Sequence, residues 1–167
     1  MEQIRIKTEN RIVTSCAFTG HRQIENDLSP KLLWDTIEHY VKNGVTTFYN
    51  GMAQGFDLLA AEAVLALKKV YPQIRLIACI PCYHQEKSFS DTDKARYVSI
   101  LQRADEQVLL SDVYFRGCMQ VRNKYMIDHA DALIAYCKKD KGGTAFTVNY
   151  CKKKYPDKEI VYVNVKG

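Results

Sequence analysis

A Gly-Gly-Thr turn in the second half of the sequence has residue types that suit phosphate binding. Gly142 and Gly143 follow an apolar run of strand length, and Thr144 opens what we expect to be a helix. A glycine turn between a strand and a helix exposes backbone N–H groups at the positive end of the helix dipole, which attracts anions. The alternative is a tight turn with Thr144 as the helix N-cap. Taken alone, the turn favours this structural interpretation, because short glycine motifs have a high false-positive rate.

A second polar turn lies near the start of the chain. Residues 12–18 are apolar enough to form a strand, and Thr19, Gly20, His21 and Arg22 follow them directly. One glycine and two potential cations after a strand suit a phosphate or a carboxylate. Both cationic residues are also common in surface loops, so this turn carries little weight by itself.

Two glycines and a carboxylate follow the next expected strand. Gly51 and Gly55, with Ala53 between them, let the backbone pass close to another group. Asp57 then has two plausible roles. As an N-cap it begins the helix expected over residues 58–70, whereas at the mouth of a sheet it can hold a ribose hydroxyl or act in catalysis.

An arginine lies on the apolar side of another expected helix. Met119, Arg122 and Met126 recur at helical spacing, which places Arg122 at the edge of a buried face. The apolar run over residues 132–137 follows this helix. Such a run is typical of a strand that is covered on both faces of a parallel sheet.

The candidate residues require a scaffold in which strands and helices alternate. The strands expected near residues 12, 74 and 132 are too apolar to face water, and the connections are short. This pattern predicts an α/β fold with a doubly wound, mostly parallel sheet and helices on both faces. Ligands of such folds bind beyond the carboxyl ends of the strands. We therefore expect four loops to converge on one crevice and to bind a phosphate-bearing ligand: residues 19–22, 51–57, 81–89 and 142–144.

The composition is that of one soluble domain. The chain has 167 residues, of which 47% are hydrophobic, enough for a substantial core. We expect a single domain over residues 1–167, with a polar leader over residues 1–10. No signal peptide or membrane span is visible, and Cys16, Cys79 and Cys137 lie in apolar runs. We therefore predict a cytoplasmic protein with reduced thiols and no membrane partner.

Two cysteine patterns are weak candidates for chemistry. Cys79 and Cys82 form a Cys-x-x-Cys motif, but Cys79 falls inside an expected strand, whereas a redox cysteine is exposed at a helix N-terminus. Cys82 and His84 lack the second ligand cluster of a zinc site. We predict neither a metal site nor a bound cofactor.

The net charge of +5 comes from one region. Residues 138–158 contain seven lysines and two aspartates, which amounts to +5, and the rest of the chain is balanced. A lysine cluster can bind polyphosphate or nucleic acid, but it is more often a solubilising face. The cluster has no aromatic platform beyond Tyr150 and Tyr155, which favours the solubilising face.

Five segments together resemble the YpsA-like branch of the SLOG superfamily. The set is specific as a whole, although each segment alone is a weak signal, and the resemblance runs from about residue 13 to residue 163. The segments are Thr19–Arg22, Gly51–Asp57, Gln85–Tyr97, Arg122–Met126 and Gly142–Thr144. The superfamily also includes the LOG proteins, which are cytokinin-activating phosphoribohydrolases, and the DNA-processing protein DprA.

The resemblance implies a Rossmann-like fold, a small nucleotide or nucleotide-derived ligand, and a homodimer. It also implies that Gly142, Gly143 and Thr144 contact phosphate. Arg122, followed by Asn123, is implied to contact the ligand.

The sequence departs from the LOG pattern at two positions, one of which carries the carboxylate that LOG enzymes need for catalysis. LOG enzymes carry a glutamate three residues after the threonine of this turn, and Thr147 stands there instead. Asn123 stands where LOG enzymes usually have lysine. Cleavage of an N-glycosidic bond builds positive charge on the ribose and needs a carboxylate. Asp57 is the most plausible substitute, whereas Asp128 is better explained by a structural role.

We therefore expect a domain that binds or senses a nucleotide-like ligand without demonstrated turnover. One alternative is a LOG-like hydrolase of nucleoside monophosphates, with Arg122 on the phosphate and Asp57 as the catalytic carboxylate. Another is a DprA-like protein that binds single-stranded DNA through the lysines of residues 138–158.

Overall fold

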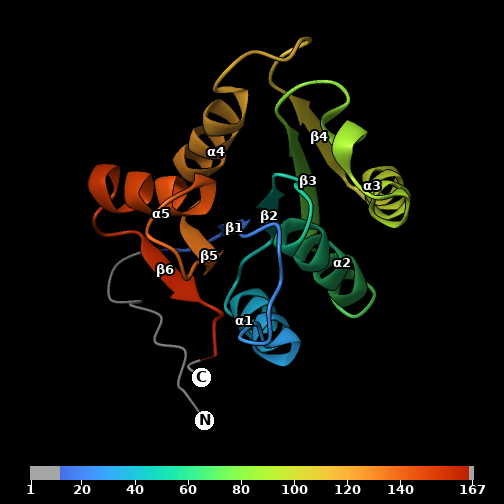
Figure 1. The fold of residues 1–167 in the computed structure, drawn as a ribbon. Coiled ribbons are helices and arrows are strands. Elements are labelled where there is room, and N and C mark those ends of the chain that lie inside the picture. The colour runs from blue at the N-terminus through green and yellow to red at the C-terminus, as the bar shows by residue number, and fades with distance from the viewer. Residues whose placement is uncertain (1–11, 166–167) are drawn as a thin grey trace.

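The structure is a computed structural model that describes residues 12–165, so the expected polar leader lies outside the described residues. Six strands form a parallel sheet with helices on both faces, which confirms the predicted fold (Figure 1). The strands are β1 (Ser15–Gly20), β2 (Thr47–Asn50), β3 (Arg75–Ile80), β4 (Glu106–Leu109), β5 (Ala132–Tyr136) and β6 (Glu159–Tyr162). The helices are α1 (Pro30–Lys42), α2 (Phe56–Lys68), α3 (Asp91–Arg103), α4 (Cys118–His129) and α5 (Gly143–Lys154), and a short 3₁₀ helix, η1, covers Gln85–Ser88.

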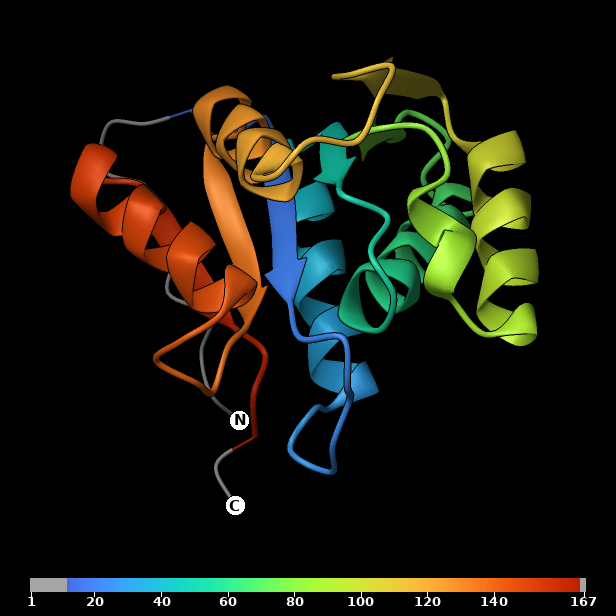
Figure 2. The same ribbon diagram turned by 45° about the horizontal axis from the view of Figure 1, so that its top comes forward.

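The order of the strands places the switch point of the sheet between β1 and β5. The strands are arranged β4-β3-β2-β1-β5-β6, and every neighbouring pair is parallel. The chain moves outward from β1 to β4 and then returns to the other side of β1. Helices α1, α2 and α3 therefore cover one face, whereas α4 and α5 pack together on the other (Figures 1 and 2). The loops after β1 and β5 diverge at this point, where ligands of open α/β sheets bind.

Local caps determine where two of the helices begin. Ser29 is the N-cap of α1 and its hydroxyl accepts a hydrogen bond from the Leu32 N–H at 3.1 Å, with Pro30 in the first turn. Ser90 caps α3 in the same way through the Asp93 N–H at 3.2 Å. In each case the hydroxyl satisfies a backbone N–H that has no partner within the helix.

Two expected caps differ in the structure. Gly55, with a φ of 89°, is the N-cap of α2, and Asp57 lies in the first turn of the helix. Gly142, with a φ of 99°, is the N-cap of α5, and Thr144 lies inside its first turn. A positive φ is accessible to glycine at little cost, so each helix has its N-cap two residues earlier than the polar residue expected to cap it.

The core has an apolar layer on each side of the sheet. Phe18 stacks on Phe48 and meets Phe56 edge to face between the sheet and α1–α3. Leu133 and Ile127 belong to the layer under α4 and α5. All six cysteines are free thiols. Between residues 12 and 165, no helix is long and apolar enough to cross a membrane.

Candidate functional site

The loop after β1 contacts the loop that leads into α2 through a hydrogen bond and a close backbone approach. Strand β1 extends to Gly20, two residues beyond the expected end, because Gly20 pairs with Tyr136 of β5. The Phe56 N–H then donates to the carbonyl oxygen of His21 at 3.1 Å. A Cβ on Gly55 would collide with the backbone of Arg22, so only glycine allows this approach.

The loop after β5 meets the same histidine. The backbone N–H of Lys138 donates to Nε2 of His21 at 3.0 Å, and the His21 ring packs edge to face on Tyr136. Burial, together with the positive charges of Lys139 and Lys138, lowers the pKa of His21. The ring is therefore neutral at pH 7, and its Nε2 can accept this bond. His21 thus joins the loops after β1, β2 and β5.

A buried guanidinium lies below these loops. Arg122 is only 4% exposed, and its Nη1 donates to the carbonyl oxygens of Gly51 and, at 3.5 Å, of Cys79. Its Nε donates to Oδ1 of Asn123 at 2.8 Å. Gln85 Nε2 donates to the same Gly51 carbonyl at 3.1 Å. Arg122 therefore connects the carboxyl ends of β2 and β3 to α4, which covers the face of the sheet opposite to α1, α2 and α3.

Asp57 is a buried carboxylate near this guanidinium. Its Oδ2 accepts the Ala53 N–H at 3.2 Å, whereas its Oδ1 is buried without a hydrogen-bond partner in the described structure. Burial raises the pKa of Asp57 to about 6, against the opposing effects of Arg122 and of the Ala53 N–H. An unpartnered buried acceptor is rare in folded proteins.

The Gly-Gly-Thr turn lies open at the start of α5. A Cβ placed on Gly142 or Gly143 would meet no atom within 4 Å. The next turn of the helix is closed: Thr147 is buried, and its hydroxyl donates to the Gly143 carbonyl at 2.9 Å. The position of the LOG glutamate is therefore occupied by a side chain that donates back to the first turn of its own helix.

The residues predicted for the site divide into an accessible rim and a buried floor. The rim residues are Gly20, His21, Arg22, Ala53, Gly55, Asn123, Gly142 and Gly143. The floor residues are Thr19, Gly51, Asp57, Arg122 and Thr144. The rim residues are the ones that remain exposed or partly exposed to solvent.

Most of the chain matches the model of a known protein family. Residues 17–166 match the model of the family YpsA, described as the YspA SLOG family. The chain belongs to this SLOG family. The resemblance inferred from the five sequence segments is thereby confirmed.

Relatives of this SLOG chain occur in bacteria. The SPbeta prophage-derived protein YoqJ of Bacillus subtilis is 34% identical over 140 residues, which cover 77% of this chain and 82% of YoqJ. The UPF0398 protein YpsA of the same organism is 30% identical over 92 residues, and the match spans 54% of this chain and only 51% of YpsA. DNA processing protein A from Helicobacter pylori superposes with a TM-score of 0.65 at 18% identity, over 90% of this chain and 65% of that one. At this identity the likeness shows a shared fold.

Gln85 and Tyr97 adjoin the buried floor, although neither was predicted as an individual site residue from the sequence. Gln85 Nε2 lies 3.4 Å from the Tyr97 hydroxyl, and both side chains are buried. The available signal was a glutamine shortly after an apolar strand, within a segment that resembles the family. Its side chain could be placed only once η1 was seen to fold back over Gly51.

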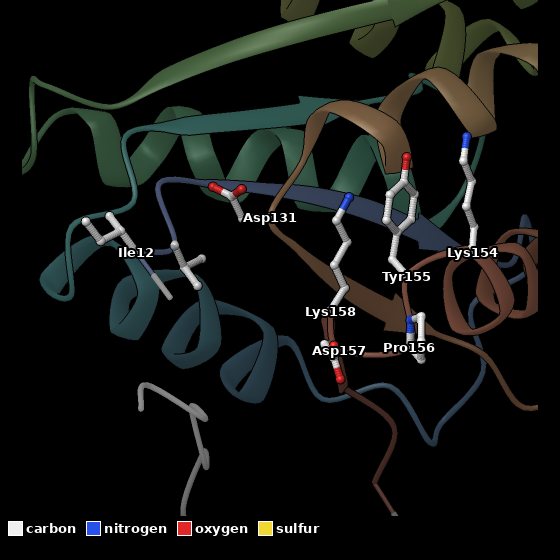
Figure 3. Close-up of a pocket in the computed structure, with 8 residues that line it drawn as sticks. Ile12, Asp131, Lys154, Tyr155, Pro156, Asp157 and Lys158 are labelled. Atoms are coloured by element: carbon white, nitrogen blue, oxygen red, sulfur yellow. The ribbon is translucent and has the colours of Figure 1, made fainter. Parts of the chain in front are cut away.

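Among residues 12–165, cavities lie beside the sheet of the SLOG domain. One of about 610 Å³ is lined by Glu25, Asn26, Asp27, Lys138 and Val165, next to the switch point. Lys138 forms ion pairs with both carboxylates of this cavity. Another, of about 560 Å³, lies at the amino ends of the strands, away from the rim, and Figure 3 shows Asp131, Lys154, Tyr155 and Lys158 among its lining residues. Asp131 already accepts hydrogen bonds from Thr14 and Ser15 there.

No metal site accompanies the rim. Among residues 12–165, no cluster of three or more histidine, cysteine or acidic side chains is arranged to hold an ion. Cys79 and Cys82 are both buried, and burial raises the pKa of each thiol. Neither has the low pKa and the exposure of a reactive cysteine.

Proposed function

We propose that this SLOG domain binds a phosphorylated, nucleotide-derived ligand on the rim at the switch point. The observation that carries the proposal is the position of His21, which joins the loops after β1, β2 and β5 into one surface. A surface built from three strand ends at a topological switch point is where open α/β sheets bind nucleotides.

The Gly142–Gly143 turn and Arg22 provide the phosphate-binding part of the proposed site. The turn is open and begins a helix of twelve residues, so its N–H groups add to the positive end of the helix dipole. Arg22 is exposed on the neighbouring loop and offers charge-assisted hydrogen bonds. Both features accept a phosphate without any movement of the buried floor.

The floor contributes through Asp57 and Arg122. The free Oδ1 of Asp57 supports a hydrogen bond from a ligand hydroxyl or amine that reaches below the rim. The guanidinium of Arg122 donates to backbone carbonyls and to Asn123. These bonds support a role for Arg122 in shaping the loop after β2, and its charge adds positive potential beneath that loop. Gly51 contacts Arg122 directly, and Thr19 and Thr144 are also buried.

The LOG-like hydrolase is the weaker enzymatic alternative. Thr147 supplies no carboxylate, and Asp128 is occupied by the Tyr150 and Tyr155 hydroxyls at 2.8 and 2.7 Å. Asp57 is then the remaining candidate, and its pKa of about 6 suits a general acid or base. Its burial beneath Ala53 supports binding without turnover as the principal function.

The proposal is tested by a thermal-shift screen with nucleoside mono- and diphosphates, ADP-ribose and NAD, each beside its dephosphorylated counterpart. We expect the phosphorylated compounds alone to raise the melting temperature. Gly143→Val should abolish this shift and keep the fold, because a Cβ there meets no atom. Mass spectrometry of the same samples detects free base, which would establish the hydrolase instead. A shift that Gly143→Val leaves unchanged would refute the phosphate site.

Single-stranded DNA is a second candidate ligand, at a different surface. The Helicobacter pylori relative by fold binds single-stranded DNA. In this chain Lys124 lies over the rings of Phe146 and Tyr150, and Lys152 lies over Tyr162. Two rings of the lysine-rich segment therefore lie beside a lysine of α4, and Lys152 of the segment lies beside a ring of β6. Rings next to cations suit unpaired bases.

Anisotropy of a labelled oligonucleotide, titrated at several salt concentrations, tests this second candidate. Lys152→Ala should weaken binding and reduce the salt dependence, because each phosphate contact releases counterions. Phe146→Ala should weaken binding with little change in salt dependence. Lys31→Ala, on the opposite face of the sheet, is the control. Binding that none of these substitutions alters would exclude this face.

A further inference from the structure

The connection between β4 and α4 carries an exposed apolar segment. Val113 is 68% exposed and Tyr114 is 71% exposed, and Phe115 and Leu109 are also exposed. In Figure 1 the connection arches beyond the ends of both β4 and α4. Clusters of exposed large apolar residues mark interaction sites on soluble proteins.

Opposite charges flank this apolar segment. The sequence reads Asp112, Val113, Tyr114, Phe115, Arg116, and both charged side chains are exposed. Within residues 12–165, neither Asp112 nor Arg116 forms an ion pair or a side-chain hydrogen bond. A second copy of the segment that runs in the opposite direction would place Asp112 of each chain against Arg116 of the other. The segment is therefore complementary to itself in charge.

We propose that residues 112–116 form the centre of a two-fold interface between two copies of this chain. The axis passes by Tyr114, which meets its own equivalent, while Val113 of each chain meets Phe115 of the other. Such an isologous contact is the commonest way in which identical chains associate. Tyrosine, phenylalanine and arginine are enriched at interfaces, and tyrosine and arginine often dominate their energetics.

Neighbouring elements extend the interface beyond the five residues. Strand β4 is an edge strand of the sheet, so one side of its backbone has no strand partner among the described residues. Tyr83 and Val121 are exposed near the start of α4, where the Cys82 and Cys118 thiols contact each other. A stable interface buries about 800 Å² on each partner, which needs these flanking residues as well.

The charge pattern distinguishes a second copy from other partners. A nucleic acid would be repelled by Asp112, and a strongly charged peptide would match only one end of the segment. The interface does not use the loops after β1 and β5. Ligand binding and self-association can therefore fail independently.

Sedimentation velocity over a range of concentrations gives the first test. We expect the wild-type chain to form dimers and Val113→Glu to raise the dissociation constant about tenfold or more. Val70→Glu is the matched control, because Val70 is 67% exposed, like Val113, but lies at the end of α2. A wild-type monomer at all concentrations, or equal effects of the two substitutions, would overturn the proposal.

A charge-swap cycle gives the second test. Asp112→Arg alone and Arg116→Asp alone each place like charges together at both ends of the segment, so each should weaken the dimer. The double variant restores opposite charges and should return the dissociation constant to within about threefold of the wild-type value. Recovery in the double variant identifies the antiparallel pairing, which loss of folding cannot imitate. A double variant as weak as the single variants would rule that pairing out.

Discussion

Arg122 fills the space that a side chain on Gly51 would occupy. A Cβ on Gly51 would lie 2.8 Å from the guanidinium carbon of Arg122, and Nη1 of Arg122 donates to the Gly51 carbonyl. The two residues come from opposite sides of the sheet and meet at its carboxyl edge. This contact makes the shape of the loop after β2 depend on a helix that follows 67 residues later, at Cys118.

Gly51→Ala should destabilise the fold through this contact. The added methyl group meets a buried guanidinium that has little room to move, and overpacking of this kind costs about 1–3 kcal/mol. Gly143→Ala is the control, because a Cβ at Gly143 meets no atom within 4 Å and its φ is not in the left-handed region. Urea denaturation of both variants measures the difference. Equal stabilities would mean that Arg122 can withdraw from Gly51 at no cost.

Arg122→Ala should cost about 3 kcal/mol of unfolding free energy near pH 7.5, because it leaves the buried Asp57 without a nearby cation and removes a donor from two carbonyls. The loss should be smaller near pH 5, where Asp57 can take up a proton. Arg103→Ala removes an exposed arginine of α3 and should change the stability by less than about 0.5 kcal/mol. A loss that is the same at both pH values would indicate lost packing alone.

Asp57 should make stability fall as the pH rises. Its pKa is raised from 3.8 to about 6 in the folded chain, so between these values the native state holds more protons than the unfolded state. The unfolding free energy then decreases across that range, by about 3 kcal/mol in total, and is constant above it. Denaturation of wild type and Asp57→Asn from pH 4 to pH 8 should show this slope in the wild type only.

Asp128 provides a control of opposite sign. Partial burial raises its pKa, but hydrogen bonds from Tyr155, Tyr150 and Lys154 outweigh this effect and leave the pKa below its ordinary value. The stability that Asp128 contributes is therefore present above the unfolded pKa and is lost as the pH falls. If Asp57→Asn and Asp128→Asn changed the pH profile in the same direction, the assignment for Asp57 would be wrong.

Thr147→Glu should not create a phosphoribohydrolase. Thr147 is 1% exposed, and its replacement would bury a carboxylate and remove the hydroxyl bond to Gly143. We expect a loss of about 2 kcal/mol or more and no release of base from nucleoside monophosphates. Thr147→Val, which removes only the hydroxyl bond, separates that bond from the effect of the charge. Base release by the glutamate variant would show that the site lacks only this carboxylate.

The sequence by itself determined the order of the elements, the parallel sheet and the loops that lie at the strand ends. These properties depend on local patterns: apolar runs of strand length, apolar residues at helical spacing, and caps such as Ser29 and Ser90. The same local patterns placed the Gly142–Gly143 turn at the start of α5. Because parallel strands end at one edge, the approximate position of the proposed site followed from the same patterns.

Only the tertiary structure decided what the polar side chains of that edge contact. A guanidinium can donate to a phosphate or to a backbone carbonyl, and Arg122 donates to the Gly51 carbonyl because packing brings together residues 71 positions apart. His21 accepts from Lys138 across 117 positions for the same reason. Asp57 is a buried acid and not a helix cap because the positive φ of Gly55 begins α2 earlier. Such contacts depend on distances between separate elements, which no local pattern in the chain specifies.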